Sequence, residues 1–168
     1  MDTRSIKTKA KIKDKYILML LHKEPVNVRA LVKKAKINKS TFYRYYSYIE
    51  ELEDEIIHDL AVETYNICKT NENGLFIENF FDYYENKMDD IRKFIFNWNI
   101  SKSSHILASL ATDDYKTAND DLHRELLMYI LANGCISLFL NKKYPREDKK
   151  RAIIDIGRAY FELIDGKR

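Results

Sequence analysis

The sequence predicts an all-α protein, and three features lead to that prediction. Of the 168 residues only 4 are Gly and 2 are Pro, far fewer turn-forming residues than a β-sandwich or a glycine-looped nucleotide-binding fold needs. Hydrophobic residues make up 45% of the chain, enough to form a core, and charged residues make up 33%. Apolar residues also recur at three- and four-residue spacing, the period of an amphipathic helix.

The first 47 residues predict three short helices. Pro25 ends the first helix, because a proline disfavours helical backbone at the residue before it. Asn27 is a good N-cap for the second helix. A tight turn over residues 35–38, with Ile37 turned inward, connects the second helix to the third. We expect these helices over residues 6–22, 28–34 and 39–45.

The rest of the chain predicts longer helices. Ser47, with Glu50 three residues later, indicates the start of a fourth helix that runs to about residue 69. The acidic residues at its start lie where the helix dipole favours them. Residues 70–74 are the clearest loop. Further helices are expected over residues 75–86, 89–98, 103–117, 121–142 and 147–164.

The charge is distributed unevenly along the chain. Residues 1–47 hold 13 Lys and Arg against 3 Asp and Glu, a net charge of +10. Residues 48–168 hold 16 against 23, a net charge of −7. A short basic segment on an acidic remainder suggests that the first part binds a polyanion, although a solvated basic face has the same composition. We therefore predict two domains, residues 1–47 and residues 48–168.

The second and third predicted helices form a helix-turn-helix pattern. In this pattern Leu31 and Ala35 face Phe42, and the small Ala35 lets the two helix axes approach closely. One side of the third helix stays free for DNA. Lys and Arg there neutralise phosphates or read guanine, and hydroxyl groups donate to phosphate oxygens. The free side carries Lys39, Ser40, Tyr43 and Arg44, with Thr41 near the N-terminal end.

The segment Thr41-Phe42-Tyr43-Arg44-Tyr45-Tyr46, followed by Glu50-Glu51-Leu52, resembles the TetR (tetracycline-repressor) family of transcriptional regulators. In that family a T-(F/L)-Y-x-(H/Y)-F segment forms the recognition helix. The resemblance covers about residues 8–55. It implies an N-terminal helix-turn-helix DNA-binding domain and a C-terminal helical domain for ligand binding and dimerisation. The residues it implies as DNA contacts are Arg29, Lys39, Ser40, Thr41, Tyr43 and Arg44.

Three positions depart from the family pattern. Lys36 stands where the family usually has Gly, and it needs a positive φ at a cost of about 1 kcal/mol. Val32 replaces a small Ala, and Ile49 replaces a Lys that contacts phosphate. These departures support an alternative, a TetR-fold coactivator or interaction protein that has lost specific DNA binding. Arg44 also has an alternative role, an ion pair with the acidic start of the fourth helix.

Aromatic residues gather in two predicted helices of the second domain. The resemblance implies a pocket for a small-molecule effector in this region, and the alternative is that the rings form core. Trp98 is the strongest pocket candidate, because a rigid ring with one donor orients a ligand. The predicted pocket residues are Phe80, Tyr84, Phe94, Trp98 and His105.

The last two predicted helices suggest a two-fold homodimer. Residues 126–140 are apolar nearly all round and need cover on both sides. Gly134 and Gly157 lie inside helices, where each costs about 0.5–1 kcal/mol relative to Ala, and close helix crossing would justify that cost. The predicted interface residues are Leu126, Ile130, Gly134, Leu138, Ile153, Gly157 and Tyr160.

Other functional classes find no support in the sequence. We find no Ser-His-Asp spacing, no paired catalytic carboxylates and no phosphate loop, so we expect no enzyme, no cofactor and no metal site. The first residues lack the apolar core of a secretory signal, and the apolar stretch 126–140 is shorter than the ~20 residues that span a membrane. Two cysteines, Cys68 and Cys135, suit a reducing compartment. We expect a cytoplasmic regulator that binds palindromic operator DNA, most often as a repressor released by a small molecule.

Overall fold

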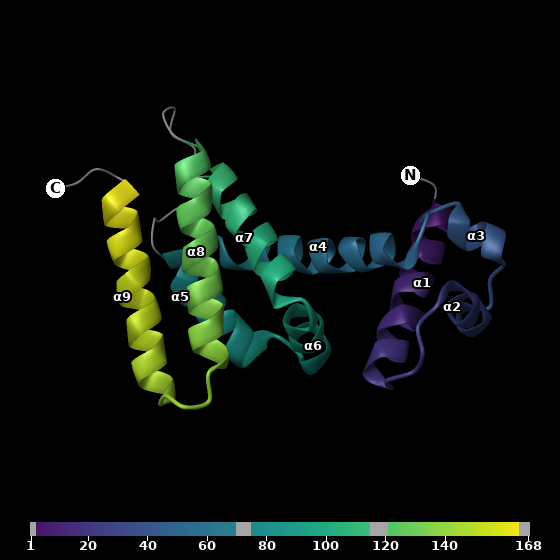
Figure 1. Ribbon diagram of the computed structural model, residues 1–168, viewed down its shortest axis with the longest axis horizontal. Coiled ribbons are helices and arrows are strands. Elements are labelled where there is room, and N and C mark those ends of the chain that lie inside the picture. The colour runs from purple at the N-terminus through teal and green to yellow at the C-terminus, as the bar shows by residue number, and fades with distance from the viewer. Residues whose placement is uncertain (1–2, 70–74, 115–120, 165–168) are drawn as a thin grey trace. The chain divides into compact units, whose positions relative to one another are not determined.

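The computed structural model describes residues 3–69, 75–114 and 121–164, and within these ranges the chain is helical and contains no strand (Figure 1). The prediction of an all-α protein is therefore confirmed. The helices are α1 (Thr3–Leu21), α2 (Val28–Ala35), α3 (Lys39–Tyr43), α4 (Ile49–Cys68), α5 (Leu75–Asp82), the π-helical turn η1 (Tyr83–Lys87), α6 (Asp90–Trp98), α7 (Ile100–Asp114), α8 (Asp121–Leu140) and α9 (Arg146–Ile164).

Several helix starts differ from the sequence prediction, and α1 already starts at Thr3 rather than at residue 6. At α4, the residue that closes the first turn is Glu51 rather than Glu50, because its Oε2 accepts the Ser47 N–H at 2.6 Å. At α7, the helix starts at Ile100 rather than at residue 103. The Asn99 Oδ1 accepts the Lys102 N–H at 3.2 Å, which satisfies a donor at the helix start.

The chain divides into two compact units, which we call the N-terminal unit (residues 1–56) and the C-terminal unit (residues 57–168). The sequence placed this boundary at residue 47. In the structure the first two turns of α4 belong to the N-terminal unit, because Leu52 and Ile56 are buried and two carboxylates of the same turns bond to α1. The residues of α4 after Ile56 belong to the C-terminal unit.

The core of the N-terminal unit forms where α1 packs on α2 and α2 packs on α3. Phe42 is completely buried, and its ring lies 5.5 Å from Tyr43 and 5.6 Å from Tyr46 between centroids. Burial of one large apolar side chain contributes about 1.5–3 kcal/mol, so a unit of this size depends on each such residue. The most completely buried side chains are Ile12, Tyr16, Met19, Leu31, Ala35, Phe42, Tyr46 and Leu52.

Polar contacts join α1 to the start of α4. The buried Tyr16 hydroxyl donates to Glu53, and Glu55 accepts from Lys9 at 2.7 Å and from Lys13 at 2.6 Å. Burial, and then the bond to Glu53, raise the pKa of the Tyr16 phenol. Partial burial works to raise the pKa of the Glu55 carboxyl, but the hydrogen bonds from Lys13 and Lys9 outweigh it, so that pKa is lowered.

The C-terminal unit contains α5 to α9, in which α7 packs on α8, α8 on α9, and α9 on α5 (Figure 1). Its core is rich in aromatic rings. The Phe139 ring makes edge-to-face contacts with Phe81 at 4.7 Å and with Tyr84 at 4.6 Å. The π-helical turn ends where the Met88 N–H donates to the Tyr83 carbonyl at 2.7 Å. This turn brings both Tyr83 and Tyr84 into the core.

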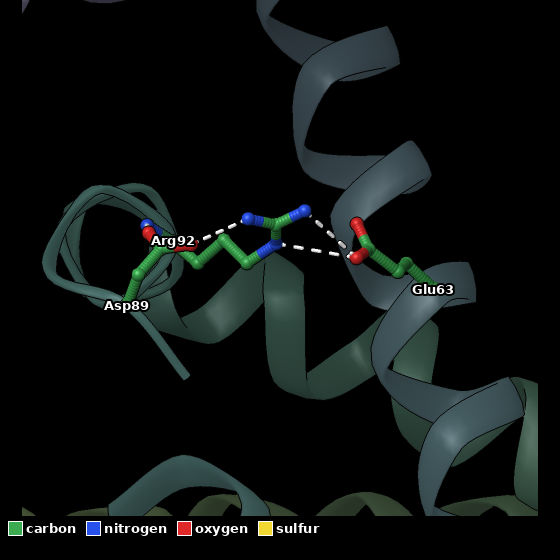
Figure 2. A network of polar contacts seen from close by, with 3 residues as sticks. All are labelled: Glu63, Asp89 and Arg92. Atoms are coloured by element: carbon green, nitrogen blue, oxygen red, sulfur yellow. Dashed lines mark hydrogen bonds and ion pairs between the residues drawn. The ribbon is translucent and has the colours of Figure 1, made fainter. Parts of the chain in front are cut away.

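Ion pairs hold helices of the C-terminal unit together. Figure 2 shows Arg92 of α6 between two carboxylates. Its Nε and Nη2 donate to Glu63 of α4 at 3.2 and 2.9 Å, and its Nη1 donates to Asp89, the N-cap of α6. The Asp89 side chain also accepts the Arg92 N–H at 2.9 Å. The hydrogen bonds from Glu63 and Asp89 raise the pKa of Arg92, which stays fully charged.

Candidate nucleic-acid interface

Helix α2, which precedes the turn to α3, is capped at both ends. Asn27 caps α2, since its Oδ1 accepts the Ala30 N–H at 2.9 Å. Lys36 at the other end has φ 51° and ψ 50°, the left-handed conformation that glycine favours. The Ile37 N–H then donates to the Val32 carbonyl at 3.0 Å, which completes the cap. The expected positive φ at Lys36 is confirmed, so the chain makes this turn without glycine.

Helix α3 is held by one buried residue and presents the others outward. Phe42 is its anchor, and the Phe42 N–H donates to the Asn38 carbonyl at 3.2 Å. Because α3 is short, a single anchored side leaves most of its side chains in solvent. Tyr43 is 54% exposed, and its ring rests edge-on against Phe42.

The predicted DNA-contact residues are accessible in the structure. Five of them are exposed and Thr41 is half-buried. Arg29 lies in the first turn of α2, and the others lie on α3 or, for Arg44, directly after it. The exposed residues are Arg29, Lys39, Ser40, Tyr43 and Arg44.

The charges on this surface are not neutralised within the described part of the chain. The alternative role predicted for Arg44 was an ion pair with a carboxylate at the start of α4. The Glu51 carboxylate in that turn instead accepts the Ser47 N–H. No ion pair joins Arg29, Lys39 or Arg44 to a carboxylate among the described residues. These three side chains are therefore available to an external anion.

A groove that the sequence analysis missed lies between α1 and α3. Its volume is ≈ 760 Å³, and it is lined by Arg4, Ser5, Thr8, Lys36, Ile37, Asn38, Thr41, Arg44 and Tyr45. Tyr45, two residues after the end of α3, is half-buried and lines this groove. The missed signal was the spacing of Arg4, Thr8 and Lys11, which places them on one face of α1.

Two of the predicted effector-pocket residues contact each other through their rings. Phe80 and Tyr84 pack together, with both rings against Phe96, and the Tyr84 hydroxyl donates to the Asn97 Oδ1 at 2.9 Å. Burial raises the pKa of Tyr84, so its hydroxyl stays protonated. His105 is exposed, and its ring lies 5.4 Å from Tyr129 instead. Phe94 and Trp98 are half-buried.

The predicted dimer interface divides into two groups. Leu126 is 52% exposed, Ile130 is 65% exposed, and Gly134 is exposed, so these residues form an outward line on α8. Ile153 and Gly157 of α9 are buried within the C-terminal unit, and this corrects their assignment to the interface. The reason is that α9 packs on both α8 and α5, so its inner face is used inside the chain. Leu138 is half-buried, and the Tyr160 side chain lies outside the described residues.

The described ranges give no support for a metal site, a reactive thiol or a membrane-spanning helix. No three His, Cys, Asp or Glu side chains there come together as metal ligands. Burial raises the pKa of Cys68 to about 12 and that of Cys135 to about 11, so both thiols are protonated at neutral pH. Among the same residues, no helix combines the length and the hydropathy needed to cross a bilayer.

Comparisons with known proteins do not place the chain in a family. No protein-family model matches the sequence, and a search of curated proteins finds no significant match. The functional argument therefore depends on the residues and their geometry.

Proposed function

We propose that this protein is a TetR-like transcriptional regulator that binds palindromic operator DNA as a homodimer. The observation that carries the proposal is the exposed surface of α3, a short helix anchored by Phe42 whose outward cations lack carboxylate partners in the described chain. A helix presented in this way fits the major groove of B-DNA, which is wide enough to admit an α-helix.

Each outward side chain has a distinct role in the proposal. Lys39, at the start of α3, neutralises a phosphate and contributes to affinity on every sequence. Ser40 and Tyr43 present hydroxyl groups that donate to phosphate oxygens or contact base edges. Arg29, in the first turn of α2, reaches the backbone on the other side of the recognition helix.

The outward line on α8 supports the homodimer. Leu126 and Ile130 are large apolar side chains left in solvent, and Ile156 of α9 is 51% exposed as well. A Cβ built on Gly134 meets no other atom within 4 Å. Packing inside the chain therefore does not require the glycine, whereas the close approach of a second helix would. A two-fold dimer would cover this line and supply the second recognition helix for a palindrome.

Release by a small molecule is the finer part of the proposal. The effector would act only through a difference in its affinity for DNA-competent and DNA-incompetent states. Helix α4 is suited to transmit that difference because it is one continuous helix that contributes residues to both units. The half-buried Phe94 and Trp98 are the positions where we would look for effector contacts.

A second candidate is an interaction protein that kept this fold and lost operator recognition. Its support is Ile49, which is half-buried and has no charge where the resembling family places a phosphate-binding Lys. The two candidates differ in the salt dependence of duplex binding. A working DNA-binding domain shows affinity that falls steeply with salt and prefers one palindrome; the alternative shows neither property.

The decisive experiment selects bound duplexes from a random pool and measures affinity for the selected sequence at several salt concentrations. We expect a palindromic consensus, and we expect Lys39→Ala to weaken binding to all duplexes and to lower the salt slope by about 1. An unenriched pool with salt-independent binding would reject the DNA-binding function. Light scattering on the eluted protein tests the dimer, which a mass of 20.0 kDa at micromolar concentration would exclude.

A further inference from the structure

We propose that the groove between α1 and α3 is a second DNA-binding site, which holds the phosphodiester backbone beside the groove read by α3. The inference rests on the proposed DNA-binding function and extends it to Arg4 and Lys36, which the resemblance does not give as DNA contacts. Arg4 of α1, Lys36 of the turn and Arg44 after α3 contribute the cationic side chains.

Helix α1 separates its basic residues onto two faces. Lys9 and Lys13 lie one turn apart and are both bonded to Glu55 of α4. Arg4, Lys7 and Lys11 lie on the opposite face, because a step of seven residues returns a helix almost to the same direction. Lys9 and Lys13 are therefore neutralised inside the unit, whereas Lys7 and Lys11 form no ion pair with the described residues and present their charge outward.

The lining of the groove matches what a phosphate oxygen needs. Between the cations lie the hydroxyl groups of Ser5, Thr41 and Tyr45 and the amide of Asn38, all of which are donors. The Thr8 hydroxyl, which also lines the groove, donates to the Arg4 carbonyl at 2.8 Å. No carboxylate is among the described residues that line the groove. Hydrogen bonds from hydroxyl and amide groups, with nearby Arg and Lys, are the usual contacts to the DNA backbone.

The extent of the basic surface favours a polymer over a small anion. A neighbouring depression lined by Thr3, Arg4, Lys7, Thr8, Lys11 and Ile37 shares Arg4, Thr8 and Ile37 with the groove. The two depressions together present five cations along α1, the turn and the end of α3. Such a row suits the repeated charges of one DNA strand, whereas a single phosphate ion would use only part of it.

The backbone conformation of Lys36 places its cationic side chain in the row of cations that lines the two depressions. Left-handed backbone at a non-glycine residue is strained, and Lys36 adopts it with φ 51° at the turn that borders the groove. The side chain is exposed and forms no ion pair with the described residues. The residue that departs from the family pattern therefore adds a cation to the groove, where glycine would add none.

The placement of Arg44 follows from the same geometry. Its side chain lines the groove together with the α1 residues rather than lying at the N-terminal end of α3. Arg44 therefore holds the backbone, and base preference depends on the residues at the start of α3. Loss of Arg44 then weakens binding to all duplexes equally.

The test compares two doubly substituted full-length proteins. Arg4→Gln with Lys36→Gln removes one Arg and one Lys from the groove. The matched control, Lys142→Gln with Arg151→Gln, removes the same charges from exposed positions of the C-terminal unit. Binding to the selected duplex and to a scrambled duplex is measured by fluorescence anisotropy from about 50 to 200 mM salt.

We expect the groove variant to bind both duplexes about tenfold more weakly, with a salt slope lower by about 1–2 and an unchanged sequence preference. The control is expected to bind like the wild type. Equal affinities for the groove variant and the wild type would overturn the second site and leave the proposed function intact. Wild-type protein that binds no duplex would instead overturn the proposed function itself.

A second variant and a titration with pyrophosphate complete the test. If the first variant loses helicity, Lys7→Gln with Lys11→Gln removes charge from the adjoining depression and is expected to lower affinity and slope in the same direction. Calorimetric titration with pyrophosphate distinguishes a free anion from the DNA backbone. Saturable micromolar binding of pyrophosphate that the groove variant abolishes would overturn the backbone assignment.

Discussion

Two arginines of the C-terminal unit are paired with carboxylates, whereas two arginines of the N-terminal unit are not. In the C-terminal unit, Arg92 is held by Glu63 and Asp89 (Figure 2), and Arg158 donates to Glu78 at 2.9 Å. In the N-terminal unit, Arg29 and Arg44 are exposed and form no ion pair with the described residues. The carboxylates of Glu24, Glu53 and Glu55 in the same unit thus leave Arg29 and Arg44 unpaired.

The difference lies in which residues the carboxylates of each unit contact. In the N-terminal unit, Glu53 and Glu55 bind residues of α1, and Lys34 lowers the pKa of Glu24 through their hydrogen bond. These carboxylates stabilise the scaffold, and none of them forms an ion pair with Arg29, Lys39 or Arg44. An unneutralised basic surface carries a repulsive cost, which an external polyanion relieves. The comparison supports the proposal that the N-terminal unit binds a polyanion.

The largest effect should come from the core of the N-terminal unit. Phe42→Ala removes a fully buried ring and should cost about 3–5 kcal/mol of unfolding free energy. Far-ultraviolet circular dichroism reports the loss of helicity, and the fluorescence of Trp98, the single tryptophan, reports the C-terminal unit alone. We expect helicity and duplex binding to fall while Trp98 emission is retained. Coincident loss of both signals would show that the units unfold together.

Phe96→Ala is the matched change in the C-terminal unit, since Phe96 is equally buried. It should cost a similar free energy but should move the Trp98 signal. Unchanged emission in this variant would contradict the separation of the two cores.

The next largest effect concerns the outward line on α8. Ile130→Glu places a charge at the centre of the proposed interface and should raise the dissociation constant of the dimer about 30-fold or more. Light scattering over a concentration series measures this change. Ile91→Glu, at a position 49% exposed on α6, is the control and should leave the dimer intact. Equal behaviour of the two variants would place the interface elsewhere.

A smaller effect is expected where α1 meets α4. Tyr16→Phe removes the hydroxyl that donates to Glu53 and should cost about 1.5 kcal/mol of unfolding free energy at neutral pH. Urea denaturation measures it. The substitution keeps the ring, so a cost above about 3 kcal/mol would indicate a loss of packing instead.

The same bond predicts how stability depends on pH. Because burial and the bond to Glu53 raise the pKa of Tyr16, the unfolded chain releases the phenolic proton first, near pH 10. The stabilisation is complete below that pH and declines as pH rises above it. Tyr16→Phe should lose less stability between about pH 10 and pH 11 than the wild type. Parallel curves for the two proteins would contradict the assigned shift.

The smallest effect has the opposite sign. Lys36→Gly relieves left-handed backbone and should stabilise the N-terminal unit by about 0.5–1 kcal/mol while weakening duplex binding. Lys23→Gly is the matched control, because Lys23 has φ 53° and does not line the groove. It should give a similar rise in melting temperature with unchanged duplex affinity. A fall in melting temperature for Lys36→Gly would show that its side chain stabilises the turn.

Local chemistry was enough to predict part of the candidate site. Asn27 caps α2 and Lys36 takes a positive φ because both features depend on a few neighbouring residues. Phe42 is the buried anchor of α3 because the helical period sets which residue faces inward. The position of Tyr45 in the groove was not predicted, because α3 ends at Tyr43 and the residues after it do not continue the helix.

Contacts between segments that are far apart in the sequence could not be predicted from the sequence pattern. The groove depends on α1 lying next to the end of α3, which brings Arg4 beside Thr41 and Arg44 across some 40 positions of the chain. The burial of Ile153 depends on which of two apolar faces of α9 packs inside the chain. Both faces are apolar, so periodicity alone does not choose between them.

The sequence by itself determined the helical class, the short-helix pattern of the first residues and the excess of positive charge there, since these follow from composition and from spacing within single helices. Only the tertiary structure decided which of those charges stay unpaired. Lys9 and Lys13 meet Glu55 while Lys7 and Lys11 do not, because a helix turns neighbouring residues to different sides and only packing places a carboxylate opposite one of them.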